Sequence, residues 1–301
     1  MRARITLTCL LTAALVPSGA RAQDAEAVVL EPASTWNASY ADGLCRLSRM
    51  FGAEGQYHAL VFEQTAPDAR FNMSVAGPGL AEVKGGVELR LSFGPDGPDS
   101  THDIVKEGNA EFGAVVFLKD IALNADEVAE ASAVEGVGFA VSSAGVSIEA
   151  ARPLREIMLA QGRQTLVFRT GPLAGPFSVL NDCTSHILST WGIDAEAHRT
   201  AQRGTRLLDV QKVARAVQEK YPLQAVVAGR GGVVGLAVGV DADGTPTECR
   251  ITYDSGDRNL NAVACEGLMK ARFDPALDAS GKPMKSYWMT RVAYRIGVGG
   301  I

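Results

Sequence analysis

The chain has 301 residues, of which 47% are hydrophobic, 21% charged and 6% aromatic. This composition is typical of a globular protein of one or two domains, and it argues against disordered, collagen-like and coiled-coil chains. The net charge is -5 at pH 7, from 29 basic and 34 acidic residues, so no broad basic surface is available to collect nucleic acid.

The first 22 residues have the layout of a secretory signal peptide. Arg2 and Arg4 precede an uncharged run at 5–16, and small residues lead to a cleavage site after Ala22. The uncharged run is 12 residues long, whereas a helix needs roughly 20 residues to span a bilayer. We therefore expect export to the periplasm and a mature chain that begins at Gln23. The alternative is an uncleaved segment that anchors the chain in the inner membrane, facing the periplasm.

The cysteine count fits an oxidising compartment. Of the five cysteines, Cys9 lies in the signal segment, which leaves four in the mature chain. Four exported cysteines predict two disulfides, with three possible pairings. The short spacing favours Cys249 with Cys265, which leaves Cys45 to pair with Cys183. The four histidines are scattered singly and no Cys-x-x-Cys motif is present, so the sequence predicts no metal site and no cofactor.

Charge divides the chain near residue 200. Residues 23–200 hold 24 acidic and 12 basic side chains, a net charge of -12, whereas residues 201–301 hold 10 and 14, a net charge of +4. This step in charge and the polar stretch at 194–206 predict a linker there. We expect a signal peptide at 1–22, an acidic disulfide-bonded domain at 23–193, the linker at 194–206 and a second domain at 207–301.

The acidic domain is predicted to be mainly β with two helices, because short β-rich runs alternate with turn clusters rich in Gly and Pro. The expected strands are 57–63, 70–76, 87–93, 114–119, 136–142 and 165–170, and the expected helices are 151–161 and 179–191. Cys183 lies on the apolar side of the second helix. A bridge to Cys45 would staple that helix to the start of the domain.

The second domain is predicted to be a β-β-α-β unit with a preceding helix. The expected elements are a helix at 210–221 that Asp209 caps and Pro222 ends, a strand at 234–240, a turn at 241–244, a strand at 247–253, a helix at 259–273 and a strand at 286–296. The helix crosses over the sheet, so the strand order is second, first, third. The fold class is therefore α+β: a mainly-β N-terminal domain with two helices, then a small three-stranded antiparallel or mixed sheet with a helix on one face.

The last strand is predicted to be a sheet edge that can bind a peptide. An edge strand has unpaired backbone N–H and C=O groups, to which an extended peptide can add as a further strand. One side carries Trp288, Val292, Tyr294 and Ile296, and the other carries Tyr287, Met289, Arg291 and Arg295. The aromatic and cationic side chains of the second set would hold a peptide with an acidic residue. The alternative is a core face and a solvated face without a partner.

A series of short motifs runs through this region in a fixed order. The motifs are Tyr221-Pro222 with Ala225, Asp243-Gly244, Ser255-Gly256, Leu260 with Ala264, Arg272-Phe273, Pro275-Ala276, Gly281 and Pro283. With the final aromatic strand, they resemble the TonB C-terminal domain family over about residues 207–297. In that family the domain lies in the periplasm and engages the TonB box and plug of outer-membrane receptors, largely by pairing through its last strand.

The resemblance implies that the last strand contacts the partner. The contact residues would be Ser286, Tyr287, Trp288, Met289, Thr290, Arg291, Val292, Ala293, Tyr294, Arg295 and Ile296. The residues with structural roles in the motifs would be Tyr221, Pro222, Gly244, Ser255, Gly256, Leu260, Ala264, Phe273, Pro275 and Gly281. The acidic domain resembles no family that we can name.

The leading hypothesis is a periplasmic binding protein that is not an enzyme. Its last strand would capture an extended segment of an outer-membrane receptor or of another periplasmic protein, linked to transport across the outer membrane. The alternative is an anchored energy transducer of the TonB type. A third hypothesis is a hydrolase that uses the acidic domain, although no nucleophile can be named there. Asp254-Ser255-Gly256 resembles the aspartic protease triplet, yet that chemistry needs two carboxylates and the triplet occurs once. Exposed edges also permit a strand-exchanged homodimer.

Overall fold

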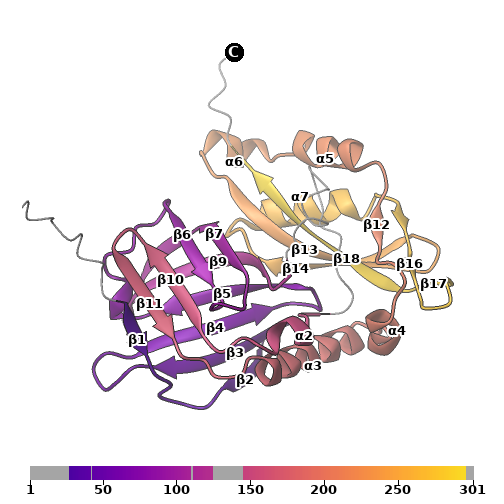
Figure 1. Cartoon of the computed structure of the whole chain (residues 1–301). Helices are drawn as coiled ribbons and strands as arrows, with labels where there is room; N and C mark the ends of the chain where they lie inside the picture. Colours follow the sequence, from indigo (N-terminus) through magenta and orange to yellow (C-terminus); the bar gives the residue numbers. More distant parts are fainter. Residues whose placement is uncertain (1–26, 42, 110, 125–144, 296–301) are drawn as a thin grey trace, which may run out of the picture.

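Two separate hydrophobic cores organise the chain. The computed structural model describes residues 27–41, 43–109, 111–124 and 145–295 (Figure 1). One core extends from Leu30 to Ile187 and the other from Leu207 to Tyr294. We call the surrounding parts the N-terminal unit, residues 27–193, and the C-terminal unit, residues 207–295. Strands predominate over helices in the described residues, which confirms the α+β class.

The N-terminal unit is built from two β-sheets that share one core. Its strands are β1 (Val28–Leu30), β2 (Asn37–Ala41), β3 (Leu44–Phe51), β4 (His58–Gln64), β5 (Arg70–Ala76), β6 (Glu88–Ser92), β7 (Asp99–Asp103), β8 (Val105–Asn109), β9 (Gly113–Ala122), β10 (Ile157–Gln161) and β11 (Gln164–Phe168). One sheet has the order β2-β3-β4-β5-β9-β8, and the other has the order β1-β11-β10-β6-β7. Apolar side chains from both sheets meet in the first core, for example Phe51 of β3 and Phe168 of β11, whose rings lie 5.2 Å apart.

The sequence located several of these strands but missed others. The predicted strands correspond to β4, β5, β6, β9 and β11, and the bounds of β5 match the prediction. The strand predicted at 136–142 lies outside the described residues. The strands β1, β2, β3, β7 and β8 have no counterpart in the prediction. Of these, β2 has all five of its residues exposed and β7 has three, so neither carries a clear apolar alternation.

The helix predicted at 151–161 is wrong. A short helix, α2 (Ile148–Ala151), ends there, and residues 157–161 form strand β10. β10 pairs with β11 across a tight turn at Gly162, whose φ is 59°, and with β6 on its other side. Leu, Met, Ala and Gln are good helix formers, but intrinsic propensity differs by less than about 1 kcal/mol per residue, so strand pairing on both sides overrides the local preference.

A long helix is fixed to the first sheet by a disulfide. The helix is α3 (Ala174–Thr190), which contains the predicted helix at 179–191 except for Trp191. Its Cys183 is bonded to Cys45 of β3, and the two Cα atoms lie 6.0 Å apart. Phe177, Leu180 and Ile187 of the same helix are buried in the first core. The expected disulfide is therefore present.

The C-terminal unit has the expected three-stranded sheet. Its elements are β12 (Arg206–Leu207), α5 (Val210–Glu219), α6 (Leu223–Val227), β13 (Gly232–Val240), β14 (Pro246–Tyr253), α7 (Arg258–Leu268), β15 (Phe273–Asp274), β16 (Ala276–Leu277), β17 (Pro283–Met284) and β18 (Ser286–Tyr294). The sheet order is β14-β13-β18 with antiparallel neighbours, which is the order expected from the sequence. Leu260, Ala264 and Leu268 of α7 are buried in the second core, and Cys249 of β14 is bonded to Cys265 of α7.

Two details at the start of this unit differ from the sequence prediction. Asp209 precedes α5, but its backbone is left-handed with φ 51° and its side chain accepts no capping hydrogen bond. The predicted cap is therefore wrong, although the helix begins at the next residue. α5 ends at Glu219, and Pro222 precedes a second short helix, α6, that the sequence did not predict.

Tight turns explain two glycines of the motif series. Gly244 has φ +82°, and a Cβ atom there would collide with the carbonyl oxygen of Phe273. The Phe273 N–H donates to the Gly244 carbonyl at 3.1 Å, so this turn is joined to the strand after α7. Gly256 has φ +80° and follows β14. Both positions require the left-handed backbone that glycine adopts without steric cost.

Residues 194–206, the predicted linker, are in contact with both units. They contain α4 (Ala195–Arg199), which Asp194 caps by accepting hydrogen bonds from the N–H groups of Glu196 and Ala197. His198 is 2% exposed, and Arg203 forms an ion pair with Asp274. The domain limits stay a prediction, but this segment is packed and hydrogen-bonded along its length.

We predict that the two disulfides stabilise the fold unequally. Cys45–Cys183 closes a sequence separation of 138 residues and Cys249–Cys265 one of 16. Loop-closure entropy gives about 5 kcal/mol for the first bridge and about 3 kcal/mol for the second. Urea unfolding of Cys45→Ala/Cys183→Ala should therefore show a larger loss of unfolding free energy than Cys249→Ala/Cys265→Ala. The reverse order would contradict the stapling role of the long-range bridge.

Candidate partner-binding strand and the cleft beside it

β18 is an edge strand of the C-terminal sheet. Within the described ranges it pairs with β13 alone, in a register that runs from Ser286 opposite Val240 to Tyr294 opposite Gly232. β14 forms the other edge. One side of β18 therefore carries backbone groups that its own sheet does not pair.

One face of β18 belongs to the core of the C-terminal unit. The rings of Trp288 and Phe273 lie 5.5 Å apart, and those of Tyr294 and Tyr221 lie 5.0 Å apart. Burial raises the pKa of Tyr294 to about 12. The other residues on this face, Ser286, Thr290 and Val292, are also buried. This is the core face that the alternation predicts.

The other face of β18 packs against the N-terminal unit through Tyr287. This side chain is 1% exposed, and its hydroxyl donates to the carbonyl oxygen of Pro67 at 2.5 Å. Its ring stacks on His198 at 4.9 Å and meets the edge of Trp191 at 5.8 Å. Burial raises the pKa of Tyr287 well above its usual value. Its side chain is thus engaged within the chain, whereas the sequence placed it on a face open to water or peptide.

Arg291 makes a second contact across the same interface. Its guanidinium forms an ion pair with Asp120 of β9 and donates to Asn72 Oδ1 of β5 at 3.4 Å. Met289 lies between Tyr287 and Arg291 on this face and is half-buried. Beyond these, Ala293 and Arg295 are exposed, and Ile296 lies outside the described residues.

The motif residues lie in turns and in the core. Tyr221 donates from its hydroxyl to the Arg230 carbonyl at 2.9 Å. Pro222 precedes α6, and Ser255 bonds Asn261 in the turn before α7. Leu260 and Ala264 are fully buried, Phe273 begins β15, Pro275 follows it, and Gly281 is in the β16–β17 turn. The structural roles that the resemblance implies for these residues stay a prediction.

Asp254 has a structural role in the same turn. Its carboxylate accepts hydrogen bonds from Asn261 Nδ2 at 2.7 Å and from the Gly256 N–H at 2.8 Å. Both bonds lower the pKa of Asp254, and the bond from Asn261 has the larger effect. An aspartic protease needs two carboxylates that share a proton, whereas the neighbours of this carboxylate are hydrogen-bond donors.

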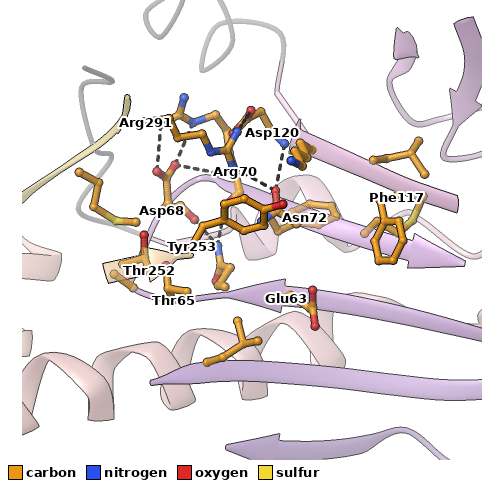
Figure 2. A pocket seen from close by; sticks show the side chains of 18 of the residues that line it. Glu63, Thr65, Asp68, Arg70, Asn72, Phe117, Asp120, Thr252, Tyr253 and Arg291 are labelled. Carbon is orange, nitrogen blue, oxygen red and sulfur yellow. Dashed lines mark hydrogen bonds and ion pairs between the residues drawn. The ribbon is translucent and has the colours of Figure 1, made fainter. Parts of the chain in front are cut away.

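A cleft of about 240 Å³ lies between the two units. Its walls come from the ends of β4, β5 and β9 on one side and from β13, β14 and β18 on the other. Figure 2 shows Asp68, Arg70, Asp120 and Arg291 gathered around one part of it, with Tyr253 close by. No local sequence pattern predicts this cleft, because its residues are distant from one another along the chain.

The charged side chains of the cleft are mostly paired. Asp68 accepts from Arg70 Nε at 3.1 Å and Nη2 at 3.0 Å, deep in the wall. Burial raises the pKa of Asp68, and the charge of Arg70 opposes that rise. Lys119 Nζ lies 4.8 Å from the centre of the Tyr253 ring. Burial lowers the pKa of Lys119, and the positive charge of Arg291 lowers it further.

The part of the chain that the structure describes contains neither a cluster of metal ligands nor a membrane-spanning helix. No group of three or more His, Cys, Asp or Glu residues there is arranged to hold a metal ion. No helix among the same residues is long and apolar enough to cross a bilayer. The uncharged run at 5–16 lies outside that part of the chain.

The β-β-α-β arrangement of the C-terminal unit corresponds to a known family. Residues 217–296 match the family described as Gram-negative bacterial TonB protein C-terminal. The C-terminal unit is therefore a TonB C-terminal domain. Proteins with this non-catalytic, transport-associated domain act in energy transduction at the cell envelope, face the periplasm and interact with outer-membrane proteins. Comparison with curated proteins and with solved structures found no match.

We predict that the buried hydroxyl of Tyr287 is the more important of two tyrosine hydroxyls. Tyr287→Phe leaves the Pro67 carbonyl without its donor and should lower the unfolding free energy by about 1–2 kcal/mol. Tyr221→Phe removes an exposed hydroxyl bond and should change it by less than about 0.5 kcal/mol. Urea unfolding of both variants measures the difference. Equal losses would mean that the Tyr287 contact does not stabilise the interface.

Proposed function

We propose that this chain is a periplasmic TonB-family protein that binds an extended peptide segment of an outer-membrane partner by strand addition at β18. The observation that carries the proposal is an edge strand at the end of a TonB C-terminal domain. Strand addition supplies affinity through main-chain hydrogen bonds, and it needs an unpaired edge of several residues. β18 spans Ser286–Tyr294 and meets that need.

The contacts of Ala293 and Tyr294 show which backbone N–H and C=O groups of β18 point away from β13. The Ala293 carbonyl accepts a hydrogen bond from Gln218 Nε2 at 3.2 Å, and Gln218 belongs to α5, outside the sheet. The Tyr294 carbonyl lies against Gly231, just before β13. In an antiparallel pair, alternate residues point their N–H and C=O groups toward the partner strand. Arg291, Met289 and Tyr287 thus present their N–H and C=O groups to a peptide. Ala293 presents its N–H, because its carbonyl already accepts from Gln218.

The location proposed for this activity is the periplasm. The signal-peptide pattern favours export with cleavage after Ala22. Two disulfides fit an oxidising space, because thiols stay reduced in the cytosol. The partner is then an outer-membrane receptor or another periplasmic protein that offers an unpaired, extended segment. A protein exported in this way would bind without its own link to an inner-membrane motor.

We predict that one N–H group at the edge of β18 controls peptide affinity. Ala293→Pro removes an outward N–H at an exposed position, where proline is compatible with an edge strand. Affinity for a synthetic peptide that carries the TonB box of a receptor from the same bacterium should fall by about tenfold, the effect of one lost main-chain bond and of the proline ring. Titration calorimetry measures this change.

The matched control is Ala293→Val, which keeps the N–H and favours a strand. It should bind the peptide as the unchanged chain does. Circular dichroism checks that both variants keep their fold. Equal affinity of the proline and valine variants would overturn strand addition at β18.

A further inference from the structure

Among the residues that the structure describes, one cation lining the cleft between the units, Lys119, forms no ion pair with a carboxylate. The carboxylates on its walls each have an ion-pair partner: Glu63 with Arg46, Asp68 with Arg70 and Asp120 with Arg291. Lys119 Nζ forms no ion pair within the described residues, and its neighbour is the ring of Tyr253. Burial and the positive charge of Arg291 both disfavour this half-buried ammonium group, and the charge of Asp120 opposes them only in part, so an anion in the cleft would relieve the remaining cost.

A β-bulge directs this part of β9 toward the cleft. Phe71 pairs with Ile121 and Met73 with Leu118, so Lys119 and Asp120 together oppose the single residue Asn72. Asp120 adopts φ 56°, which is rare for a residue other than glycine. The Asp120 N–H donates to Asn72 Oδ1 at 3.3 Å, and this bond helps to hold the bulge. Bulges of this kind re-aim side chains and often lie next to binding sites.

The rest of the cleft is lined largely by apolar side chains. Leu44, Phe117, Val233 and Met289 line it and are half-buried. Tyr253 is 52% exposed and marks the opening, beside the Lys119 ammonium group. A volume of about 240 Å³ holds roughly eight water molecules, or a small organic molecule of similar size.

We propose that this cleft binds a small apolar molecule that carries one carboxylate group. The carboxylate pairs with Lys119 Nζ at the opening. The apolar part of the ligand lies along Val233, Met289 and Phe117. The ligand thus touches both units. On β18 it contacts the side chain of Met289, whereas the peptide of the proposed function pairs with the backbone edge of the same strand.

The charges that line the cleft favour a ligand with one negative charge over a more highly charged anion. Three cations and three carboxylates line the cleft, and Glu63 pairs with Arg46 outside that lining, so Lys119 is the lining cation that is left to pair with an added anion. Glu63, Asp68 and Asp120 also line the cleft and repel a more highly charged anion such as phosphate. The apolar walls contribute nothing to an anion without a hydrocarbon part.

The test is titration calorimetry of the full mature chain with three probes at pH 7. Sodium hexanoate has a carboxylate and a short apolar chain, hexan-1-ol has the chain alone, and inorganic phosphate has the charge alone. Hexanoate should bind about tenfold more tightly than hexan-1-ol, because a charge-assisted hydrogen bond contributes at least the 1.4 kcal/mol that corresponds to a factor of ten. It should also bind about tenfold more tightly than phosphate, which has no hydrocarbon chain to bury and is repelled by the carboxylates of the cleft.

Three variants test the residues of the site. Lys119→Met keeps the aliphatic stem and should weaken hexanoate binding by about tenfold, and Val233→Phe should weaken it by filling the cleft. Lys84→Met changes an exposed lysine elsewhere on the N-terminal unit and should leave binding unchanged. Thermal unfolding verifies that each variant is folded.

Three results would overturn the proposal. They are no binding of hexanoate to the unchanged chain, equal binding of hexanoate and hexan-1-ol or phosphate, and unchanged hexanoate affinity in folded Lys119→Met.

Discussion

The burial of Tyr287 between the two units is the contact on which the arrangement of this molecule depends. Its hydroxyl is bonded to Pro67 of the N-terminal unit, its ring lies on His198 of the connecting segment, and its backbone belongs to β18. A small cluster of Ala66, Leu188, Ile193 and Tyr287 surrounds it. A fully buried aromatic side chain contributes a few kcal/mol, which is enough to favour one relative placement of two small units.

This contact changes what the last strand can offer to a partner. Trp288 and Tyr294 on one face lie in the core, and Tyr287 and Arg291 on the other face contact the N-terminal unit. Only the edge of β18 then remains for a peptide, so recognition there would rest on main-chain bonds more than on side chains. The same docking of the two units creates the cleft that contains Lys119.

The sequence predicted the parts of this structure that local patterns determine. Alternation located β5 and β14, the apolar stripe located α7, and cysteine spacing gave both disulfide pairs. It failed at β10, where residues with helical preference are paired on both sides by strands distant in sequence. It also failed at Asp209, because cap chemistry depends on a backbone conformation that a residue type does not fix.

The interface and the cleft could not be predicted, for a related reason. Tyr287 and Pro67 are separated by 220 residues, and the alternation of β18 cannot tell a solvated face from one that packs on another unit. The bulge that holds Lys119 and Asp120 opposite Asn72 arises from the pairing of β5 with β9 and leaves no mark in either segment alone. The family motifs, by contrast, lie within one contiguous region and were visible in order.

Residue-level amide hydrogen exchange of the full chain, with and without the receptor peptide, tests the central claim most directly. That claim is that the units stay docked while the peptide pairs with the edge of β18. It predicts slower exchange at Tyr287, Met289, Arg291 and Ala293, no change along β14, and no loss of protection in the strands of the N-terminal unit that border the interface. Protection along β14, or faster exchange at the interface as the peptide binds, would contradict it.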